Sequence, residues 1–127
     1  MPDELIGTDF IVSDSVPPAL YSRDLKICLT RRSLKHIAEK ADGRKLFKLI
    51  PLILRDCHAI YSGSKDNRLI IARWMLADTN IKPHIVSAEI MDSNTLIIVT
   101  AFVAKQKYLK NFKILWRTAY PPSAYSL

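Results

Sequence analysis

Two short segments of the chain carry side chains that can bind phosphate and move protons. The first segment, Arg31 to His36, holds two arginines, a lysine and a histidine. The second segment ends an apolar stretch with Arg117 and Thr118, ahead of a Pro121-Pro122 pair. Histidine transfers protons near neutral pH, and arginine clamps phosphate through paired hydrogen bonds. If the fold brings both segments together, their side chains form a set suited to breaking a phosphodiester bond.

Such a set would cut RNA without a metal ion. The 2′-hydroxyl attacks the neighbouring phosphorus when one group takes its proton, another protonates the leaving oxygen and a cation stabilises the equatorial oxygens. We therefore expect His36, Arg117 and Thr118 to be the catalytic residues of an endoribonuclease that forms a 2′,3′-cyclic phosphate. Basic side chains would hold the RNA backbone, and tyrosines would stack on unpaired bases. The residues expected to bind RNA are Arg31, Arg32, Lys35, Lys40, Tyr120, Ser123 and Tyr125.

The charge distribution is compatible with a polyanionic partner. The chain has 19 Lys and Arg against 12 Asp and Glu, which gives a formal net charge of +7. Residues 31–48 hold seven of these bases and only two acids, and no acid follows Asp92. Two positive segments of this kind attract phosphate chains by releasing counterions, without sequence preference. Lysines that only keep a fold soluble would give the same composition.

Other kinds of site find little support in the spacing. The three histidines, His36, His58 and His84, and the two cysteines show no ligand spacing of the zinc-site kind, so we expect no metal and no other cofactor. Cys28 and Cys57 lie among apolar neighbours, which predicts buried thiols in a reducing compartment. No apolar run approaches the roughly 20 residues that span a bilayer.

The elements that must position these residues follow from hydrophobic periodicity. We expect residues 1–22 to form an N-terminal arm and residues 23–127 to form one domain. A short strand over 24–30 precedes a helix capped by Thr30 or Ser33, in which the apolar spacing places His36 on the polar face. Gly43 ends that helix. A second helix then runs to about Asp56, with a kink or a new start at Pro51.

The second half of the chain predicts strands joined by short turns. Their alternation and apolar runs are typical of half-buried and buried strands. The expected strands span residues 58–62, 68–76, 84–90, 95–104 and 112–119. Consecutive strands with turn connections favour an antiparallel meander. The sequence therefore predicts an α+β domain with an antiparallel four- to five-stranded sheet and both N-terminal helices on one face.

One helix start and one strand end resemble a known family. The order of elements, the segment Ser33-Leu34-Lys35-His36-Ile37 and the polar end of the last strand resemble the barnase/EndoU/colicin/RelE superfamily of small metal-independent ribonucleases. The resemblance covers about residues 24–123 and is greatest to the phage-associated and contact-dependent-inhibition toxin branches. It implies that His36 is catalytic, that Arg117 and Thr118 lie at the active-site end of the last strand, and that Arg31 or Lys40 assists at phosphate. Because Lys40 stands where a second histidine often ends the helix, the acid and base roles stay open.

The resemblance also implies a biological setting. It predicts a monomeric bacterial toxin domain that acts in the cytoplasm on tRNA or another structured RNA and that is delivered as part of a secreted toxin. An acidic immunity or antitoxin protein would then cover the basic cleft. Two other functions remain open at this point. One is a non-catalytic RNA-binding or phage-associated adaptor module of the same fold, and the other is a structural module whose basic face docks an acidic protein.

Overall fold

The computed structural model describes residues 5–8, 26–39, 43–92 and 95–118 of the 127-residue chain. Its elements follow the sequence in the order strand, strand, helix, helix and then strands, with a 3-10 helix before the last strand. They are β1 (Leu5–Thr8), β2 (Lys26–Thr30), α1 (Arg31–Ala38), α2 (Gly43–Arg55), β3 (Ala59–Ser62), β4 (Arg68–Ala77), β5 (Asn80–Asp92), β6 (Thr95–Val103), η1 (Gln106–Asn111) and β7 (Ile114–Arg117). The fold class is α+β.

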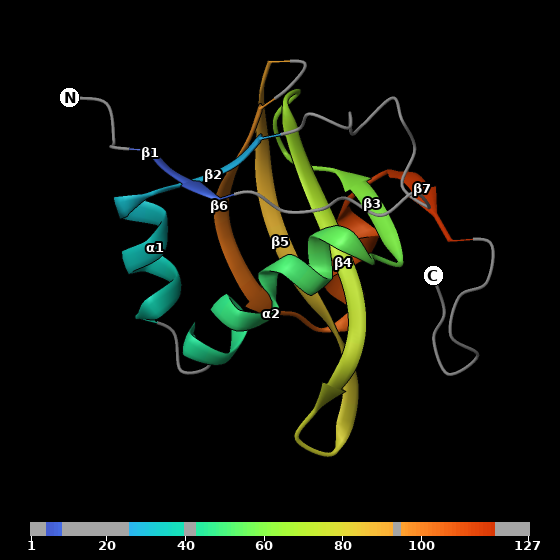
Figure 1. Cartoon of the computed structure of the whole chain (residues 1–127). Coiled ribbons are helices and arrows are strands. Elements are labelled where there is room, and N and C mark those ends of the chain that lie inside the picture. The colour runs from blue at the N-terminus through green and yellow to red at the C-terminus, as the bar shows by residue number, and fades with distance from the viewer. Residues whose placement is uncertain (1–4, 9–25, 40–42, 93–94, 119–127) are drawn as a thin grey trace.

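The strands of the described residues form one seven-stranded sheet in the order β1-β2-β6-β5-β4-β3-β7 (Figure 1). β3 to β6 make the predicted antiparallel meander, and β7 extends it by pairing with β3. The expected four- to five-stranded antiparallel sheet is wrong in three respects. The last strand, β7, pairs with β3 and not with β6, its predecessor in the chain. β2 pairs with β6 in parallel, and β1, from the expected N-terminal arm, adds an antiparallel strand beyond it. Parallel pairing is possible here because α1 and α2 carry the chain across the sheet between β2 and the meander.

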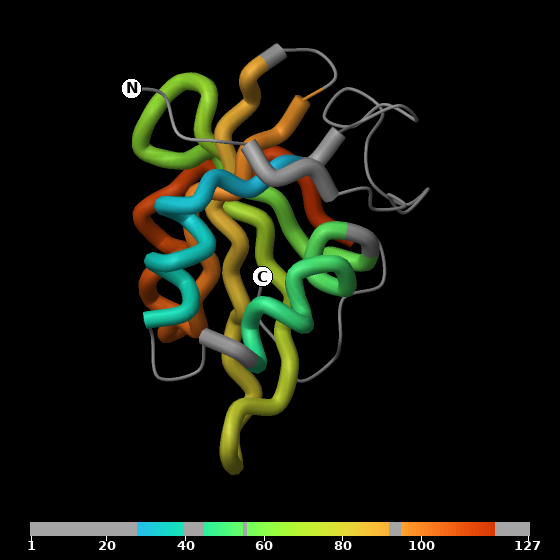
Figure 2. Tube along the Cα trace, turned by 60° about the vertical axis from the view of Figure 1, so that its left-hand side comes forward, coloured from blue at the N-terminus to red at the C-terminus, as the bar shows by residue number. Residues whose placement is uncertain are grey.

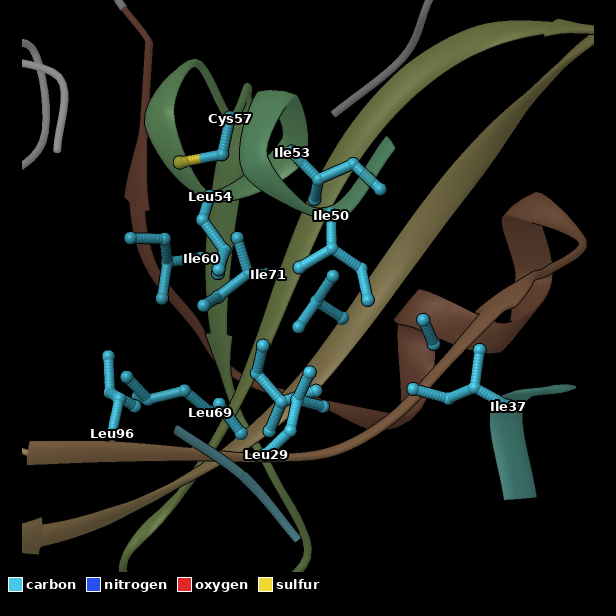
Figure 3. Packing of buried hydrophobic residues seen from close by; sticks show 14 residues of the cluster. Leu29, Ile37, Ile50, Ile53, Leu54, Cys57, Ile60, Leu69, Ile71 and Leu96 are labelled. Atoms are coloured by element: carbon cyan, nitrogen blue, oxygen red, sulfur yellow. The ribbon is translucent and has the colours of Figure 1, made fainter. Parts of the chain in front are cut away.

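Each face of the sheet has its own hydrophobic cluster. On one face, which we call the helix face, Ile37 of α1 and Ile53 of α2 pack with strand residues such as Ile71 (Figure 3). On the opposite face, which we call the η1 face, Leu109 of η1 packs against Trp74 and its neighbours. The two helices therefore share one face as predicted, whereas η1 lies in the segment expected to be a lysine-rich loop. Successive residues of a strand point to opposite faces, so both clusters draw on the same strands.

Local interactions explain where α1 begins. Thr30 is the N-cap, because its Oγ1 accepts a hydrogen bond from the Ser33 backbone N–H at 3.0 Å. The Thr30 hydroxyl in turn donates to the Ser33 Oγ at 2.9 Å. Of the two predicted caps, Thr30 therefore performs the role. Ile37 is fully buried while His36 is exposed, as the apolar spacing predicts.

The β4–β5 hairpin is longer than its sequence pattern predicts. Pairing continues to Leu76 opposite Ile81 and Ala77 opposite Asn80, and the turn is Asp78-Thr79. Asp78 has φ of 56°, a left-handed conformation that aspartate tolerates better than most residues. The hairpin extends past the rest of the sheet (Figures 1 and 2). At its tip Leu76 and Ile81 are both exposed.

Replacement of Ile53 tests how far the sheet depends on α2. Ile53 is fully buried in the helix-face cluster, so Ile53→Ala should lower the free energy of unfolding by about 2–5 kcal/mol. Phe47→Ala is the matched control, because Phe47 lies on the same helix but is 41% exposed. Urea denaturation followed by circular dichroism measures both. Equal losses in the two variants would show that α2 does not pack as described.

Candidate active site

The first predicted site residues lie on the exposed surface of α1. Arg31, Arg32, Lys35 and His36 are all exposed, and α1 packs on β2 and β6 and against α2. Lys40 lies outside the described residues, as do Tyr120, Ser123 and Tyr125. The basic side chains at the start of α1 therefore form a surface group at the β2 side of the sheet.

Arg117 and Thr118 lie at the other side of the sheet. β7 pairs with β3 at the opposite edge (Figure 1), and four strand spacings of about 4.8 Å put β6 and β7 about 19 Å apart along the sheet. The prediction that His36, Arg117 and Thr118 share one cleft is therefore wrong. The physical reason is that β2 pairs with the outer edge of β6, and α1 follows β2 directly in the chain. That edge of β6 is therefore occupied, and β7 pairs with β3 instead. The basic segments 31–48 and 105–117 also fail to share one side, because α1 and α2 cover the helix face and η1 covers the other.

Strand register instead places a different histidine beside Thr118. The Thr118 N–H donates to the His58 carbonyl at 2.9 Å, and the His58 N–H donates to the Ala72 carbonyl at 2.9 Å. His58 lies just before β3, and its Nε2 lies 3.3 Å from Nη1 of Arg73, while Arg73 pairs with His84 on β5. Side chains directly across neighbouring strands lie on one face about 5 Å apart. Contacts thus link Thr118 to His58, His58 to Arg73 and Arg73 to His84, and we call these four residues the polar row.

Arg73 and His84 of the polar row lie on the helix face, where the apolar core ends. On β4 and β5, Arg73 and His84 follow the alternation of Ile71 and Val86, which belong to the helix-face cluster. Asp56, directly after α2, lies at the same end of the sheet and contacts Arg73. The row therefore begins where α2 ends and continues beneath it.

Arg73 ties the end of α2 to the sheet. Its Nη1 donates to the Asp56 backbone carbonyl at 2.6 Å and to the Asp56 carboxylate at 3.2 Å. Its Nε is buried and has no hydrogen-bond partner among the described residues. A buried donor left unsatisfied costs about 1–3 kcal/mol, and such groups in folded proteins call for an explanation. Arg68 has the same unsatisfied Nε beside Glu89 but has no histidine across from it.

His58 is held as a neutral hydrogen-bond donor. Its Nδ1 accepts the Trp74 backbone N–H at 3.0 Å, so in the neutral ring the proton is on Nε2. That Nε2 lies 3.3 Å from Nη1 of Arg73, which places two donors side by side. Burial lowers the pKa of His58, and the Arg73 charge lowers it further, while Asp56 acts in the opposite direction. Two adjacent N–H donors are suited to an anionic oxygen.

In His84 the proton of the neutral ring is on the other nitrogen than in His58. It is 3% exposed, and its Nδ1 lies 3.0 Å from the Lys82 carbonyl, which can only accept. The Nδ1 therefore carries the proton, and Nε2 is the nitrogen of the neutral ring that can accept one. His84 lines a small cavity of about 30 Å³ together with Lys45, Leu46, Leu49, Ala77, Asp78 and Val103. A cavity of this volume holds about one water-sized group.

The cysteines take no part in this chemistry. Both are free and buried, which confirms the prediction of buried thiols. Burial raises the pKa of the Cys57 thiol to about 12, although it is next to His58 in the sequence. Cys57 therefore stays protonated near neutral pH and is a poor nucleophile.

The polar row was missed because its members are far apart in the sequence. His58, Arg73 and His84 were all present, but only strand register aligns them. One signal was available in the sequence. Within the mostly apolar segment Arg68–Leu76, Arg73 stands two residues after Ile71, so the alternation of a strand places both side chains on the same buried face. A charged residue at such a position needs a partner, which points to a polar site.

Comparison with known proteins leaves the family open. No protein-family model matches the chain, and no curated protein or solved structure matches it either. In the described part of the chain, no helix is both long and apolar enough to cross a membrane. In the same part, no three His, Cys, Asp or Glu side chains gather in a group that could hold a metal ion. The resemblance to the barnase/EndoU/colicin/RelE superfamily stays a prediction.

The hydrogen bonds of His58 predict a pH-dependent stability. Because the folded-state pKa of His58 lies below its ordinary value of 6.5, protonation costs the folded state more than the unfolded state. Its contribution to stability is complete above about pH 6.5 and is lost as the pH falls below that value. His58→Asn offers an oxygen to the Trp74 N–H but does not titrate. The loss of unfolding free energy between about pH 7.5 and about pH 5.5 should therefore be smaller in His58→Asn than in the wild type.

Urea denaturation at the two pH values measures this difference. His36→Asn is the control, because it makes the same substitution at a histidine on the exposed surface of α1. An identical loss in the wild type and in His58→Asn would contradict the described environment of His58.

Proposed function

We propose that the protein is a metal-independent endoribonuclease that acts by 2′-hydroxyl transesterification, with its reacting groups in the polar row. The observation that carries this proposal is the set of contacts that brings Thr118, His58, Arg73 and His84 next to one another. This set contains the residue types that metal-free cleavage of RNA needs, namely histidine, arginine and a hydroxyl. Relative to the sequence hypothesis, Thr118 keeps its role, while His58, His84 and Arg73 replace His36 and Arg117 at the reacting bond.

Arg73 and His58 would bind the phosphate. Their donors lie 3.3 Å apart and repel one another unless a negative oxygen lies between them. The buried Nε of Arg73 is a further donor that a phosphate oxygen would satisfy. Donors fixed in advance stabilise the charge that develops on the equatorial oxygens as the 2′-hydroxyl attacks. The hydroxyl of Thr118, across from His58, would hold another phosphate oxygen.

His84 would accept the proton of the 2′-hydroxyl. Its Nδ1–H is directed at the Lys82 carbonyl, which fixes the ring orientation and makes Nε2 the basic nitrogen. Arg73 lies between His58 and His84 in the row, so a phosphate on Arg73 has a donor on one side and a proton acceptor on the other.

The setting implied by the resemblance is part of the same proposal. We propose a bacterial toxin domain that acts as a monomer in the cytoplasm on tRNA or another structured RNA and that an acidic immunity or antitoxin protein inhibits. The net charge of +7 and the exposed bases of α1 support an anionic substrate and an acidic inhibitor.

One observation favours a non-catalytic RNA-binding or adaptor module instead. Arg73 already donates to the carbonyl and the carboxylate of Asp56, so it performs a structural task without any ligand. In that case the polar row would only anchor α2, and RNA would bind elsewhere on the basic surface. The two functions differ in whether RNA is cut.

Total tRNA incubated with the protein in EDTA should yield discrete fragments with 2′,3′-cyclic phosphate ends. His84→Gln and Arg73→Lys should each lower the cleavage rate by roughly two or more orders of magnitude, because one removes the proton acceptor and the other removes the forked donor but keeps the charge. Gel electrophoresis of end-labelled tRNA measures the rates. Circular dichroism checks that both variants fold.

His36→Ala is the matched histidine control and should retain the wild-type rate within about threefold, since exposed surface changes have small effects. Loss of activity in His36→Ala with full activity in His84→Gln would return the catalytic role to α1. The absence of any cleavage by the wild type would favour the RNA-binding module.

A further inference from the structure

A second and larger pocket lies on the η1 face, opposite α1 and α2. Its volume is about 560 Å³, within the range of about 300–1,000 Å³ that is usual for small-ligand sites. It is lined by Phe102, Val103, Ala104, Lys105, Lys107, Tyr108 and Asn111. We call this pocket the η1 groove. It contains none of the residues of the polar row.

The aromatic rings of the η1 groove are fixed by their neighbours. The Tyr108 ring packs edge-on against Phe102, with ring centroids 5.3 Å apart, and against Phe112, with centroids 5.1 Å apart. The Asn111 side-chain amide donates to the Tyr108 carbonyl at 3.1 Å. At the start of η1, the Trp74 indole N–H donates to the Gln106 side chain at 2.7 Å. A rigid aromatic surface loses little conformational entropy when a ligand stacks on it.

The groove is also strongly cationic. Lys105 and Lys107 line it, and the lysines nearby, Lys110 and Lys113, are exposed as well. No residue from 95 to 118 is acidic. Burial raises the pKa of Tyr108, so its hydroxyl stays neutral and does not offset the lysine charges near neutral pH. A ligand that fits must therefore be anionic and must present a flat ring.

We infer that the η1 groove binds one unpaired nucleotide of single-stranded RNA. The base would stack on Tyr108 and Phe102, and the flanking phosphates would bind Lys105 and Lys107. A paired base does not fit this description, because its faces are covered by its neighbours in the duplex. The choice of RNA as the ligand rests on the proposed function, while the groove itself does not depend on the polar row.

The position of the groove has a kinetic consequence. Because the groove lining includes none of the residues of the polar row, a nucleotide bound in the groove is not the one whose bond is cut. Groove variants should therefore raise KM for a long RNA and leave kcat unchanged, which is the sign of an interaction made equally in the ground state and the transition state.

Fluorescence anisotropy with a labelled 12-nucleotide 2′-O-methyl oligouridine tests the groove directly. This probe cannot be cleaved, because its 2′-oxygen carries no proton. Lys105→Gln/Lys107→Gln should weaken binding about tenfold or more and reduce the log–log salt slope by about 1.4, which is about 0.7 for each lost phosphate contact. Tyr108→Leu should weaken binding about fivefold or more, because stacking on the ring is lost. A duplex of the same length should bind the wild type more weakly than the single strand.

Lys48→Gln/Lys65→Gln is the charge-matched control, because both lysines are exposed on other parts of the fold. It removes the same charge and should change affinity less than about threefold if binding is local. Equal losses in the two double variants would overturn the inference. So would a labelled polyglutamate peptide that binds as tightly as the oligouridine, since this would indicate a site for an acidic protein.

Failure of the proposed function and failure of the groove inference would give different experimental results. If the wild type cuts no tRNA but the groove variants still lose oligouridine binding, the groove inference stands and the catalytic proposal falls. If tRNA is cut and KM is unchanged in Lys105→Gln/Lys107→Gln, the catalytic proposal stands and the groove inference falls.

Discussion

The arrangement of both faces of the sheet depends on the register of β4 against its neighbours β3 and β5. Side chains alternate along a strand, so a shift of one residue would exchange Ile71 and Arg73 with Ile70 and Ala72 between the two faces. The helix-face cluster, the η1-face cluster and the polar row would all be lost together. The register is stable because β4 is buried on both faces over most of its length, which penalises any slipped pairing.

The polar row is located where that apolar alternation is interrupted. Arg73 occupies a buried-face position at the end of the core, and the backbone carbonyl and carboxylate of Asp56 satisfy part of its guanidinium. His58 is kept neutral there by the same arginine and by burial. The interaction of Arg73 with Asp56 therefore has two effects. It anchors the end of α2 to the sheet, and it orients the donors that a phosphate would meet.

Local pattern was enough to predict most elements but not their arrangement. The helices, the Thr30 cap and five of the strands follow from periodicity and capping, which act between residues close in sequence. β5 was predicted to start at His84 but starts at Asn80, and within it Pro83 pairs with Trp74 and its carbonyl accepts the Ala104 N–H at 2.9 Å. The parallel contact of β2 with β6 joins residues about 70 apart and has no local signal. For the same reason sequence analysis chose His36 as the partner of Thr118, whereas a backbone hydrogen bond joins Thr118 to His58.

The parallel β2–β6 pair also has a consequence for how the chain folds. β3 to β6 are joined by short connections, so their pairing closes small loops and loses little chain entropy. β2 can find its place only after β6 exists, and closing that much longer loop is slow. We therefore expect the β1–β2 edge to assemble on a preformed meander and α1, which follows β2 directly, to be positioned in the same late step. Until then the free edge of β6 is an open template on which a strand from another chain can pair.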